Sequence, residues 1–242
     1  MSLAGAPHRY VFADHQLGGL ALTLSGTPVI CRPSGALWVE MAGALIVADL
    51  HLEKGSSFAL RGQMLPPYDS GETLSRLEAE AAALAPRLIV LLGDTFHDRA
   101  AESRLSAADA ARLRALAAGR SLVFVAGNHD AEAPRNLPGD SVDRLTVGGL
   151  DLVHEPSPVS GGAEVAGHLH PCARLRGYGM GVRRRCFVTD GERIVLPAFG
   201  AFAGGLNVRD LAFRPLFRRS PLAAILGAAR VHAVGWRSLG GD

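Results

Sequence analysis

The sequence has few cysteines, a single lysine and no long apolar run. Only 3 cysteines occur in 242 residues, and Cys31, Cys172 and Cys186 lie far apart and outside any C-x-x-C spacing. This pattern predicts reduced thiols and argues against both a disulfide framework and a zinc knuckle. No apolar stretch has the length of a membrane-spanning helix, and residues 1–14 lack the apolar core of a signal peptide. We therefore expect a cytoplasmic protein without a membrane segment.

Almost all of the positive charge comes from arginine, because Lys54 is the only lysine among 25 basic residues. Residues 1–170 carry 13 Lys or Arg against 19 Asp or Glu, whereas residues 171–237 carry 12 Arg against 3 acidic residues. Asp242 contributes the last charge, so a balance of −6, +9 and −1 gives the total of +2. A basic C-terminal third suits an anionic partner such as nucleic acid, although a solvated arginine-rich surface explains the same count. The composition leaves both interpretations open.

The length and the 48% hydrophobic content predict one domain, residues 1–242, with a sizeable core. Short apolar runs alternate with helical patterns, which indicates an α/β (α+β) layered fold. Continuous, β-branched runs predict buried strands at residues 44–48 (ALIVA), 88–92 (LIVLL) and 121–126 (SLVFVA). The later segments 151–154, 163–167, 182–188 and 193–196 are also strand-like.

Two helices are predicted between the first three strands. Asp69 and Glu72 resemble a capping box, and apolar residues then recur at helical spacing until Pro86. Ser106 and Asp109 begin the second helix, and Gly119 is a suitable residue to follow its last turn. The expected order is therefore β-α-β-α-β followed by a strand-rich half.

Polar residues stand where the predicted strands end. The blocks are Asp49-Leu50-His51, Gly93-Asp94, Gly127-Asn128-His129-Asp130, His154, and Gly167-His168-Leu169-His170. Ligands of α/β sheets gather outside the carboxyl ends of strands, so the five blocks are expected to converge. Five of the 9 histidines fall inside these blocks. One block alone is a weak signal and an isolated histidine at a strand end is usually structural, but five ordered blocks favour a functional site.

The donors in these blocks suit a metal centre. In D-x-H and H-x-H the two ligands are two residues apart, so on an extended segment they point the same way. Carboxylate, imidazole and amide oxygen without thiolate favour Mn, Fe or Zn. A single Asp after a central strand supplies the anionic bridge that two ions need. A pair of ions clamps a phosphoryl group and activates the attacking water.

These blocks resemble the calcineurin-like metallophosphoesterase superfamily over residues 49–170. The resemblance implies a four-layer αββα sandwich with a two-metal site at one sheet edge. It implies that Asp49, His51 and His170 bind the first ion, that Asn128, His154 and His168 bind the second, and that Asp94 bridges both. It further implies that His129 is the general acid and that Asp130 orients its ring. Protonation of the leaving oxygen is also what an alkoxide leaving group requires.

Three further stretches resemble the ligase-associated DNA damage response endonuclease subfamily: residues 47–57 (VADLHLEKGSS), 61–69 (RGQMLPPYD) and 196–207 (LPAFGAFAGGLN). This resemblance implies a Mn-dependent phosphodiesterase or endonuclease of DNA repair, with DNA as substrate and a DNA ligase, an exonuclease and a helicase in the same pathway. The alternatives are a small-molecule phosphodiesterase or phosphomonoesterase on the same fold, or a non-catalytic metal-binding scaffold in a repair complex. The oligomeric state stays open.

One stretch departs from the superfamily pattern. Many members carry an acidic residue and an arginine shortly after the Gly-Asp pair, where this chain has His97 and Asp98. We expect a structural role for His97, with a phosphate contact or a hydrogen bond to a metal ligand as the alternatives. Lys54 is either a phosphate contact or solvated, and Arg61, Arg174, Arg176 and the run Arg183, Arg184 and Arg185 are candidates for DNA backbone contacts. Trp38, Phe199 and Phe202 are expected in the core.

Overall fold

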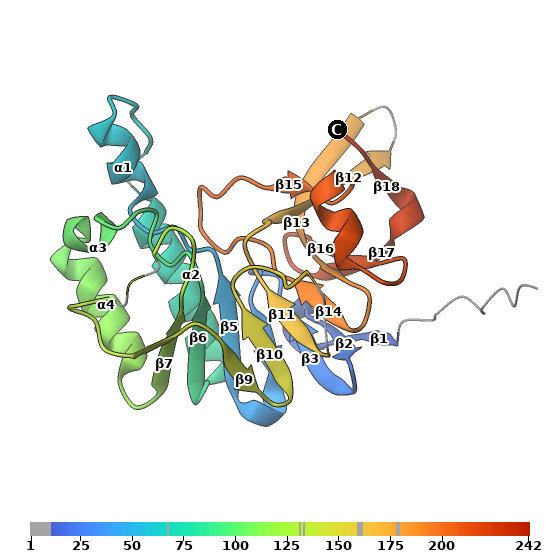
Figure 1. Cartoon of the computed structure of the whole chain (residues 1–242), viewed down its shortest axis with the longest axis horizontal. Helices are drawn as coiled ribbons and strands as arrows, with labels where there is room; N and C mark the ends of the chain where they lie inside the picture. The colour runs from blue at the N-terminus through green and yellow to red at the C-terminus, as the bar shows by residue number, and fades with distance from the viewer. Residues whose placement is uncertain (1–10, 67, 131, 133, 159–161, 178–179) are drawn as a thin grey trace, which may run out of the picture.

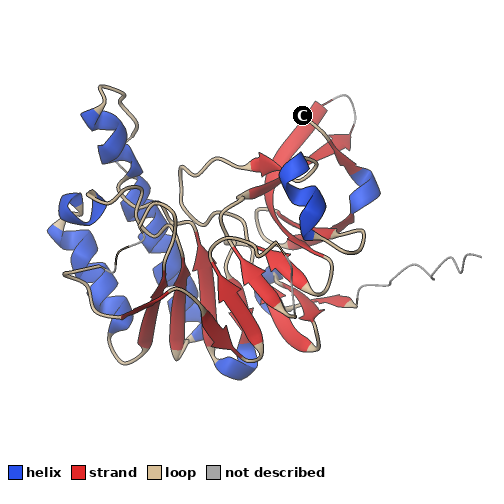
Figure 2. Ribbon diagram, in the orientation of Figure 1, coloured by secondary structure: helices blue, strands red, loops and turns tan. Residues whose placement is uncertain are grey.

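The computed structural model describes residues 11–66, 68–130, 132, 134–158, 162–177 and 180–242. Its strands form two sheets, with the α-helices on one side (Figures 1 and 2). The helical side and the two facing sheets confirm the predicted α/β layering. No helix in the described part of the chain is long and apolar enough to cross a membrane. All three cysteines are free thiols, as predicted.

The first sheet has eight strands in chain order. They are β1 (Phe12–Asp14), β2 (Leu20–Leu24), β3 (Thr27–Cys31), β4 (Leu37–Val39), β5 (Ala44–Ala48), β6 (Leu88–Leu92), β7 (Ser121–Val125) and β8 (Asp140–Val142). The strands β5 to β8 are parallel, and β1 to β5 form an antiparallel meander. The three predicted strands of this region are therefore confirmed as β5, β6 and β7. The meander before them was not predicted.

The helices connect the parallel strands of the first sheet. They are α1 (Lys54–Leu60), α2 (Asp69–Leu84), α3 (Ala101–Arg104) and α4 (Ala107–Ala117). Ser106 begins α4 as predicted, because its side chain accepts a hydrogen bond from the Asp109 amide. The expected capping role of Asp69 is wrong: Tyr68 precedes the helix, and the buried Asp69 carboxylate accepts a hydrogen bond from the Gly55 amide instead. Asp69 thus ties the start of α2 to α1.

The second sheet has ten strands, arranged around the order β15-β12-β13-β14-β11-β10-β9. Its members are β9 (Leu145–Val147), β10 (Leu150–Val153), β11 (Glu164–Ala166), β12 (Pro171–Gly177), β13 (Met180–Thr189), β14 (Arg193–Val195), β15 (Leu206–Asn207), β16 (Leu222–Leu226), β17 (Val231–Gly235) and β18 (Leu239–Gly240). The β16 strand pairs with β13 and β17, and β18 pairs with β12. The four later strand-like segments correspond to β10, β11, β13 and β14, so the strand-rich second half is confirmed.

The central strand β5 shows why its sequence is apolar throughout. Ala44, Ile46 and Ala48 belong to the core between the two sheets, whereas Leu45 and Val47 belong to the core beneath α2 and α4. Both faces of β5 are therefore covered, and no alternation of polar residues is left. Each fully buried aliphatic side chain contributes about 1.5–3 kcal/mol, so this strand is a rigid base for the loop that follows it.

The outer face of the second sheet carries no α-helix among the described residues. A third, smaller core lies there, and the 3-10 helices η3 (Leu211–Leu216) and η4 (Trp236–Ser238) belong to this part of the chain. Two further 3-10 helices, η1 (Gln16–Gly18) and η2 (Glu40–Ala42), adjoin the first sheet. The α-helical layer and the two sheets of the expected αββα sandwich are present, whereas short 3-10 helices stand in the C-terminal part where a second α-helical layer was expected (Figure 2).

Candidate metal centre

Both sheets contribute to one cluster of acidic and imidazole side chains. Asp49 follows β5, Asp94 follows β6, and His129 lies in the loop after β7. His154 follows β10, and His168 and His170 lie between β11 and β12. The carboxyl ends of the parallel strands therefore converge as predicted, and the second sheet brings its histidines to the same edge.

Most of the predicted ligands have an unusual backbone conformation. Asp49, His51, Asp94, His168 and His170 have φ of 56°, 45°, 46°, 70° and 46°. This left-handed region costs free energy for residues other than glycine, and such residues gather at functional sites. The expectation that D-x-H and H-x-H lie on extended backbone is therefore wrong. The loops turn sharply at each ligand, and these turns aim the side chains into the cluster.

The Asp49 carboxylate is the anchor of one side of the cluster. It is 0% exposed, and its two oxygens accept hydrogen bonds from the His168 amide at 3.2 and 3.0 Å. Its Oδ1 lies 3.2 Å from His170 Nε2 and 3.8 Å from His154 Nδ1. Asp49, His51 and His170 form a group whose ligand atoms all lie within 4.8 Å of one another.

Asp94 lies at the centre of the cluster and is 2% exposed. Its Oδ1 accepts a hydrogen bond from the His129 amide at 2.9 Å and lies 3.5 Å from His154 Nε2. Its Oδ2 lies 3.9 Å from both His51 Nε2 and His129 Nε2. The two carboxylate oxygens therefore face different histidines, and Asp49, Asp94 and His154 form a second ligand group.

Glycines allow this close packing. A Cβ on Gly127 would lie 2.2 Å from the Asp94 amide nitrogen and 2.3 Å from Asp94 Oδ1. A Cβ on Gly93, which has φ of +73°, would lie 2.1 Å from His154 Nδ1. Side chains at these two positions would displace the central carboxylate and His154, which explains the glycine at the start of the Gly-Asp and Gly-Asn-His blocks.

The charges in the cluster call for a cation. Neither Asp49 nor Asp94 pairs with a lysine or arginine in the described part of the chain, although both are buried. Burying an unpaired carboxylate is costly. Burial, followed by the charges of His170 and His129, lowers the pKa of His51 to about 2, so this ring is neutral at pH 7. A neutral ring does not neutralise the carboxylates.

The orientation of the imidazole nitrogens also fits a divalent ion. The Nε2 atoms of His51 and His170 face each other at 3.2 Å, and His154 Nε2 is buried without a hydrogen-bond partner. Two neighbouring carboxylates with imidazole nitrogens around them are the donor set that a divalent ion accepts. The residues present therefore fit the metal ions that the sequence motifs imply.

His129 lies at the open side of the cluster, with 46% of its side chain exposed. Its Nδ1 is hydrogen-bonded to the His97 carbonyl oxygen at 2.8 Å, which leaves Nε2 facing Asp94. The expectation that Asp130 orients this ring is not met. The Asp130 Oδ2 instead accepts a hydrogen bond from the Phe96 amide at 3.0 Å. Asp130 therefore holds the 96–97 segment, whose carbonyl holds His129. Burial raises the pKa of Asp130 to about 6.

His97 is the residue that the sequence interpretation undervalued. Its ring stacks on the His129 ring with the centroids 5.6 Å apart. The ring nitrogens of His51, His97 and His129 that could bind a metal lie within 4.8 Å of one another. Burial lowers its pKa, and the neighbouring charge of Lys54 contributes. A purely structural role was expected, yet the side chain faces the cluster. The sequence offered one indication of a functional role for His97: it lies three residues after Asp94, where the chain departs from the superfamily pattern.

Two other predicted residues differ in their placement. Asn128 is exposed, and its side chain makes no hydrogen bond within the described part of the chain. Lys54 is half-buried beside the cluster, where its Nζ donates to the Phe202 carbonyl at 3.1 Å. The rings of Trp38 and Phe199 lie in the core as predicted, whereas Phe202 is only half-buried.

The arginines of the second sheet divide into exposed and internal ones. Arg185 donates to the carbonyls of Ala198, Ala201 and Ala203, so it holds the 198–203 loop and does not face solvent as a DNA contact would. Arg183 and Arg184 are exposed, and Arg183 donates to the Gly205 carbonyl. Arg174 is half-buried opposite Arg183 on the neighbouring strand, and the side chain of Arg176 lies outside what the structure describes.

Known proteins support the interpretation of the cluster. The structure is similar to that of the Pseudomonas putida nuclease MPE, with a TM-score of 0.67 and 26% identity over 93% of this chain and 100% of that chain. A more distant likeness, with a TM-score of 0.40 and 17% identity, covers 79% of this chain and 98% of Yfce, a phosphoesterase from E. coli. No curated protein sequence matches the chain.

Residues 44–185 match the family model of the calcineurin-like phosphoesterases, and this matched range includes every polar block of the cluster. The match confirms the superfamily resemblance, and the likeness to a nuclease is consistent with the narrower endonuclease resemblance. The protein belongs to the calcineurin-like phosphoesterase family, whose members hydrolyse phosphoric esters with divalent metal ions.

Proposed function

We propose that the protein is a binuclear metal-dependent phosphodiesterase that cleaves DNA, with a role in DNA repair. The observation that carries this proposal is the buried pair Asp49 and Asp94, whose side-chain partners in the described part of the chain are imidazoles, with His129 half-exposed beside Asp94. Family membership supports the hydrolysis of a phosphoric ester. The likeness to a nuclease supports a phosphodiester substrate.

Two ions are proposed because two of the ligand groups in the cluster contain a carboxylate, namely Asp49 with His51 and His170, and Asp49 with Asp94 and His154. Asp49, His51 and His170 would hold one ion, and Asn128, His154 and His168 would hold the other, with Asp94 between them. The different neighbours of the two Asp94 oxygens support the bridging role. Bound divalent ions supply neutralisation of the phosphoryl oxygens and activation of the attacking water. The oxygen- and nitrogen-rich donor set suits Mn, with Fe or Zn as alternatives.

His129 is proposed to protonate the leaving oxygen. Its Nδ1–H donates to the His97 carbonyl, which fixes the ring and leaves Nε2 for the transferred proton. The half-exposed position lets this atom reach a bound substrate, whereas Asp49, Asp94 and His154 are buried. Asp130 acts on His129 through the Phe96 amide and the neighbouring carbonyl of His97.

Residues 1–242 are proposed to act as one domain, because each sheet supplies only part of the cluster. Asp49, Asp94 and His129 come from loops of the first sheet, and His154, His168 and His170 come from the second. The proposed pathway partners are a DNA ligase, an exonuclease and a helicase, in the cytoplasm. This part of the proposal rests on the subfamily resemblance of residues 47–57, 61–69 and 196–207.

The test is a substrate panel with Mn-loaded protein. It compares bis-p-nitrophenyl phosphate, p-nitrophenyl phosphate, single-stranded DNA and double-stranded DNA, with the ion content of each sample measured. We expect hydrolysis of the diester and of DNA to exceed hydrolysis of the monoester. Turnover of the monoester with no cleavage of DNA would contradict the proposal and favour a small-molecule phosphomonoesterase. Intact metal loading without turnover of any substrate would favour the scaffold.

A further inference from the structure

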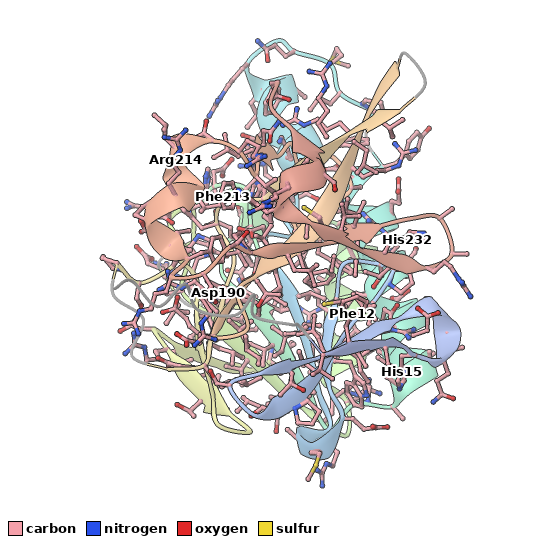
Figure 3. All side chains as sticks on the ribbon, turned by 90° about the vertical axis from the view of Figure 1, so that its right-hand side faces the viewer. Phe12, His15, Asp190, Phe213, Arg214 and His232 are labelled. Carbon is pink, nitrogen blue, oxygen red and sulfur yellow. The ribbon has the colours of Figure 1, made fainter. Side chains whose placement is uncertain are left out.

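A separate basic hollow lies in the C-terminal part of the molecule. It has a volume of about 520 Å³ and is lined by Arg209, Arg214, Trp236, Arg237, Ser238, Leu239 and Gly241. None of these residues belongs to the metal centre. Arg214 lies on η3 and Trp236 and Arg237 on η4, so separate segments of the chain bring the three arginines together. Figure 3 labels Arg214 and the neighbouring Phe213, with Arg214 nearer the outer edge of the view.

The hollow is held in place by the core beneath it. Phe213 is 0% exposed and anchors η3, and Asp210 caps η3 by accepting a hydrogen bond from the Ala212 amide. Leu239 is buried in β18 and its carbonyl accepts a hydrogen bond from Arg209 Nε at 3.3 Å. The backbone segments that carry Arg209 and Arg214 are therefore held by buried neighbours, and the Arg209 guanidinium is held by its hydrogen bond, whereas the side chains of Arg214 and Arg237 are exposed to solvent.

The positive charge in the hollow is not neutralised by the protein. Arg209, Arg214 and Arg237 form no ion pair in the described part of the chain, and the acidic side chains nearest in sequence, Asp210 and Asp242, pair with none of them. Arginine groups left without a carboxylate partner are suited to bind phosphate, because the guanidinium donors match two phosphate oxygens at once.

An aromatic wall accompanies this charge. The Arg209 guanidinium lies over the Trp236 ring, 4.9 Å from the ring centroid, and both residues line the hollow, where we refer to them as the Arg209–Trp236 platform. Unpaired nucleobases stack on aromatic rings and on guanidinium planes, and the stacking tolerates any base. Inorganic phosphate has no base to stack on the platform. A base that is paired within a duplex is already stacked between its neighbours and is not free to stack there.

The hollow is connected to the metal centre by the edge of the second sheet. His170 directly precedes β12, and its carbonyl accepts a hydrogen bond from the Leu206 amide at the start of β15. Four residues further along β12, about 13 Å at the usual rise, Arg174 pairs with Gly240 of β18. Arg183 is exposed on β13 opposite Arg174, so positive charge continues between the two places.

We propose that the hollow binds an unpaired nucleotide of a nucleic-acid strand whose scissile phosphodiester lies at the metal centre. Arg214 and Arg237 hold its phosphates, and the Arg209–Trp236 platform stacks its base. The inference rests on the proposed phosphodiesterase function and gives that function a substrate class, namely a strand with unpaired bases that extends several nucleotides from the cleaved bond.

The test compares long and short substrates. In Mn-loaded protein, the double substitution R214A/R237A should raise KM about tenfold for a single-stranded oligonucleotide of about 16 nucleotides. It should leave turnover of bis-p-nitrophenyl phosphate and of a dinucleotide unchanged, because neither reaches the hollow. In a plot of the logarithm of the oligonucleotide binding constant against the logarithm of the salt concentration, the slope should become less steep by about 0.7 for each phosphate that the variant no longer binds. Arg230→Ala is the matched control, because Arg230 is exposed at the β16–β17 turn and does not line the hollow.

Tryptophan fluorescence provides a direct readout of the platform. Trp38 is buried in the core, so quenching by an added oligonucleotide reports on the half-exposed Trp236. The titration uses Mn-loaded protein with His129→Ala to slow cleavage. We expect quenching that disappears in R214A/R237A and persists with Arg230→Ala. Inorganic phosphate and a mononucleotide are titrated in parallel.

The outcomes separate the two proposals. Normal DNA cleavage with equal KM in R214A/R237A and Arg230→Ala overturns the inference and leaves the nuclease function intact. Quenching by a mononucleotide or by phosphate as strong as that by the oligonucleotide also overturns it, because the hollow would then gain nothing from a strand that extends to the metal centre. Absence of DNA cleavage and DNA binding by the unsubstituted protein contradicts the proposed function itself.

Discussion

The two sheets hold charge in opposite ways. In the loops of the first sheet, Asp49 and Asp94 are buried with no lysine or arginine partner in the described chain, and imidazoles surround them. In the second sheet, Arg193 is 1% exposed and engaged on several sides: it pairs with Glu164 at 2.6 Å and donates to the carbonyls of Leu216 and Ser157. The first arrangement calls for a cation from outside the protein, whereas the second balances its own charge.

This difference shows that a count of charges does not describe a surface. Residues 171–237 have a balance of +9, but Arg185 and Arg193 are used inside the fold. The balance of positive charge open to a ligand is correspondingly smaller, and part of it is concentrated around the hollow of Arg209, Arg214 and Arg237. A buried charge without a partner indicates a binding function more strongly than an excess of one charge along the sequence.

The largest effect is expected from removing the central charge of the first sheet. Asp94→Asn should abolish both metal binding and turnover, because a neutral amide does not bridge two cations as a carboxylate does. The measurement is ion content per chain together with hydrolysis of bis-p-nitrophenyl phosphate. Full occupancy by two ions in Asp94→Asn would show that Asp94 is not the bridge.

A smaller loss is expected at the open side of the same cluster. His129→Ala should keep the ions and lower turnover by about 10²–10⁴-fold, the usual contribution of a general acid. The control compares two leaving groups. Turnover of a substrate with an acidic leaving group such as p-nitrophenol should fall less than turnover of DNA, because the p-nitrophenolate oxygen needs little protonation. Loss of ions equal to that in Asp94→Asn would mean that His129 is a ligand.

The sequence predicted the parallel core and the convergence of the polar blocks because both depend on local patterns. The runs at 44–48, 88–92 and 122–126 are apolar because both faces of each strand are covered. The polar blocks directly follow these strands, so the end of a strand fixes where its ligands lie. The order of the blocks therefore predicted that Asp49, Asp94 and His154 meet, and their side chains do lie in one group.

The remaining features depend on contacts between distant residues. Nothing near Asp130 in the sequence shows that its carboxylate binds the Phe96 amide and not the His129 ring. The brace that Arg185 forms with residues 198–203 likewise joins segments that only the folded chain brings together. The left-handed backbone at Asp49 and His51 was missed because aspartate and histidine carry no obligatory signal for it.

An intermediate effect, on stability, is expected from the buried arginine of the second sheet. Arg193→Met leaves Glu164 buried without its partner, and breaking such a pair costs about 3–5 kcal/mol. The measurement is the denaturant midpoint of unfolding, compared with Arg230→Met at an exposed position. The double variant Glu164→Gln/Arg193→Met should recover part of the loss, because it removes the isolated charge. Equal midpoints for Arg193→Met and Arg230→Met would contradict the internal role of Arg193.

The smallest effect is expected from the half-buried pair Asp98–Arg104 on the helical side of the first sheet. Arg104 donates to both carboxylate oxygens of Asp98, at 3.0 and 2.7 Å, and these bonds are the main cause that lowers the pKa of Asp98 to about 2. The side chains are 18% and 31% exposed, so solvent screens the pair and its contribution is on the order of 1 kcal/mol. A carboxyl whose pKa is lower in the folded state stabilises the fold above the unfolded pKa of 3.8, and this contribution disappears as the pH falls through about 2.

Unfolding of metal-free protein should therefore show Arg104→Ala to be less stable than the unsubstituted chain near neutral pH. The difference in stability between the two proteins should shrink as the pH falls from 3.8 to about 2. Arg135→Ala is the control, because its partner Glu132 is 69% exposed and Arg135 itself is 81% exposed. A gap that stays constant down to the lower value would show that Arg104 stabilises the protein through its hydrogen bond to Ser56 and not through the charge of Asp98.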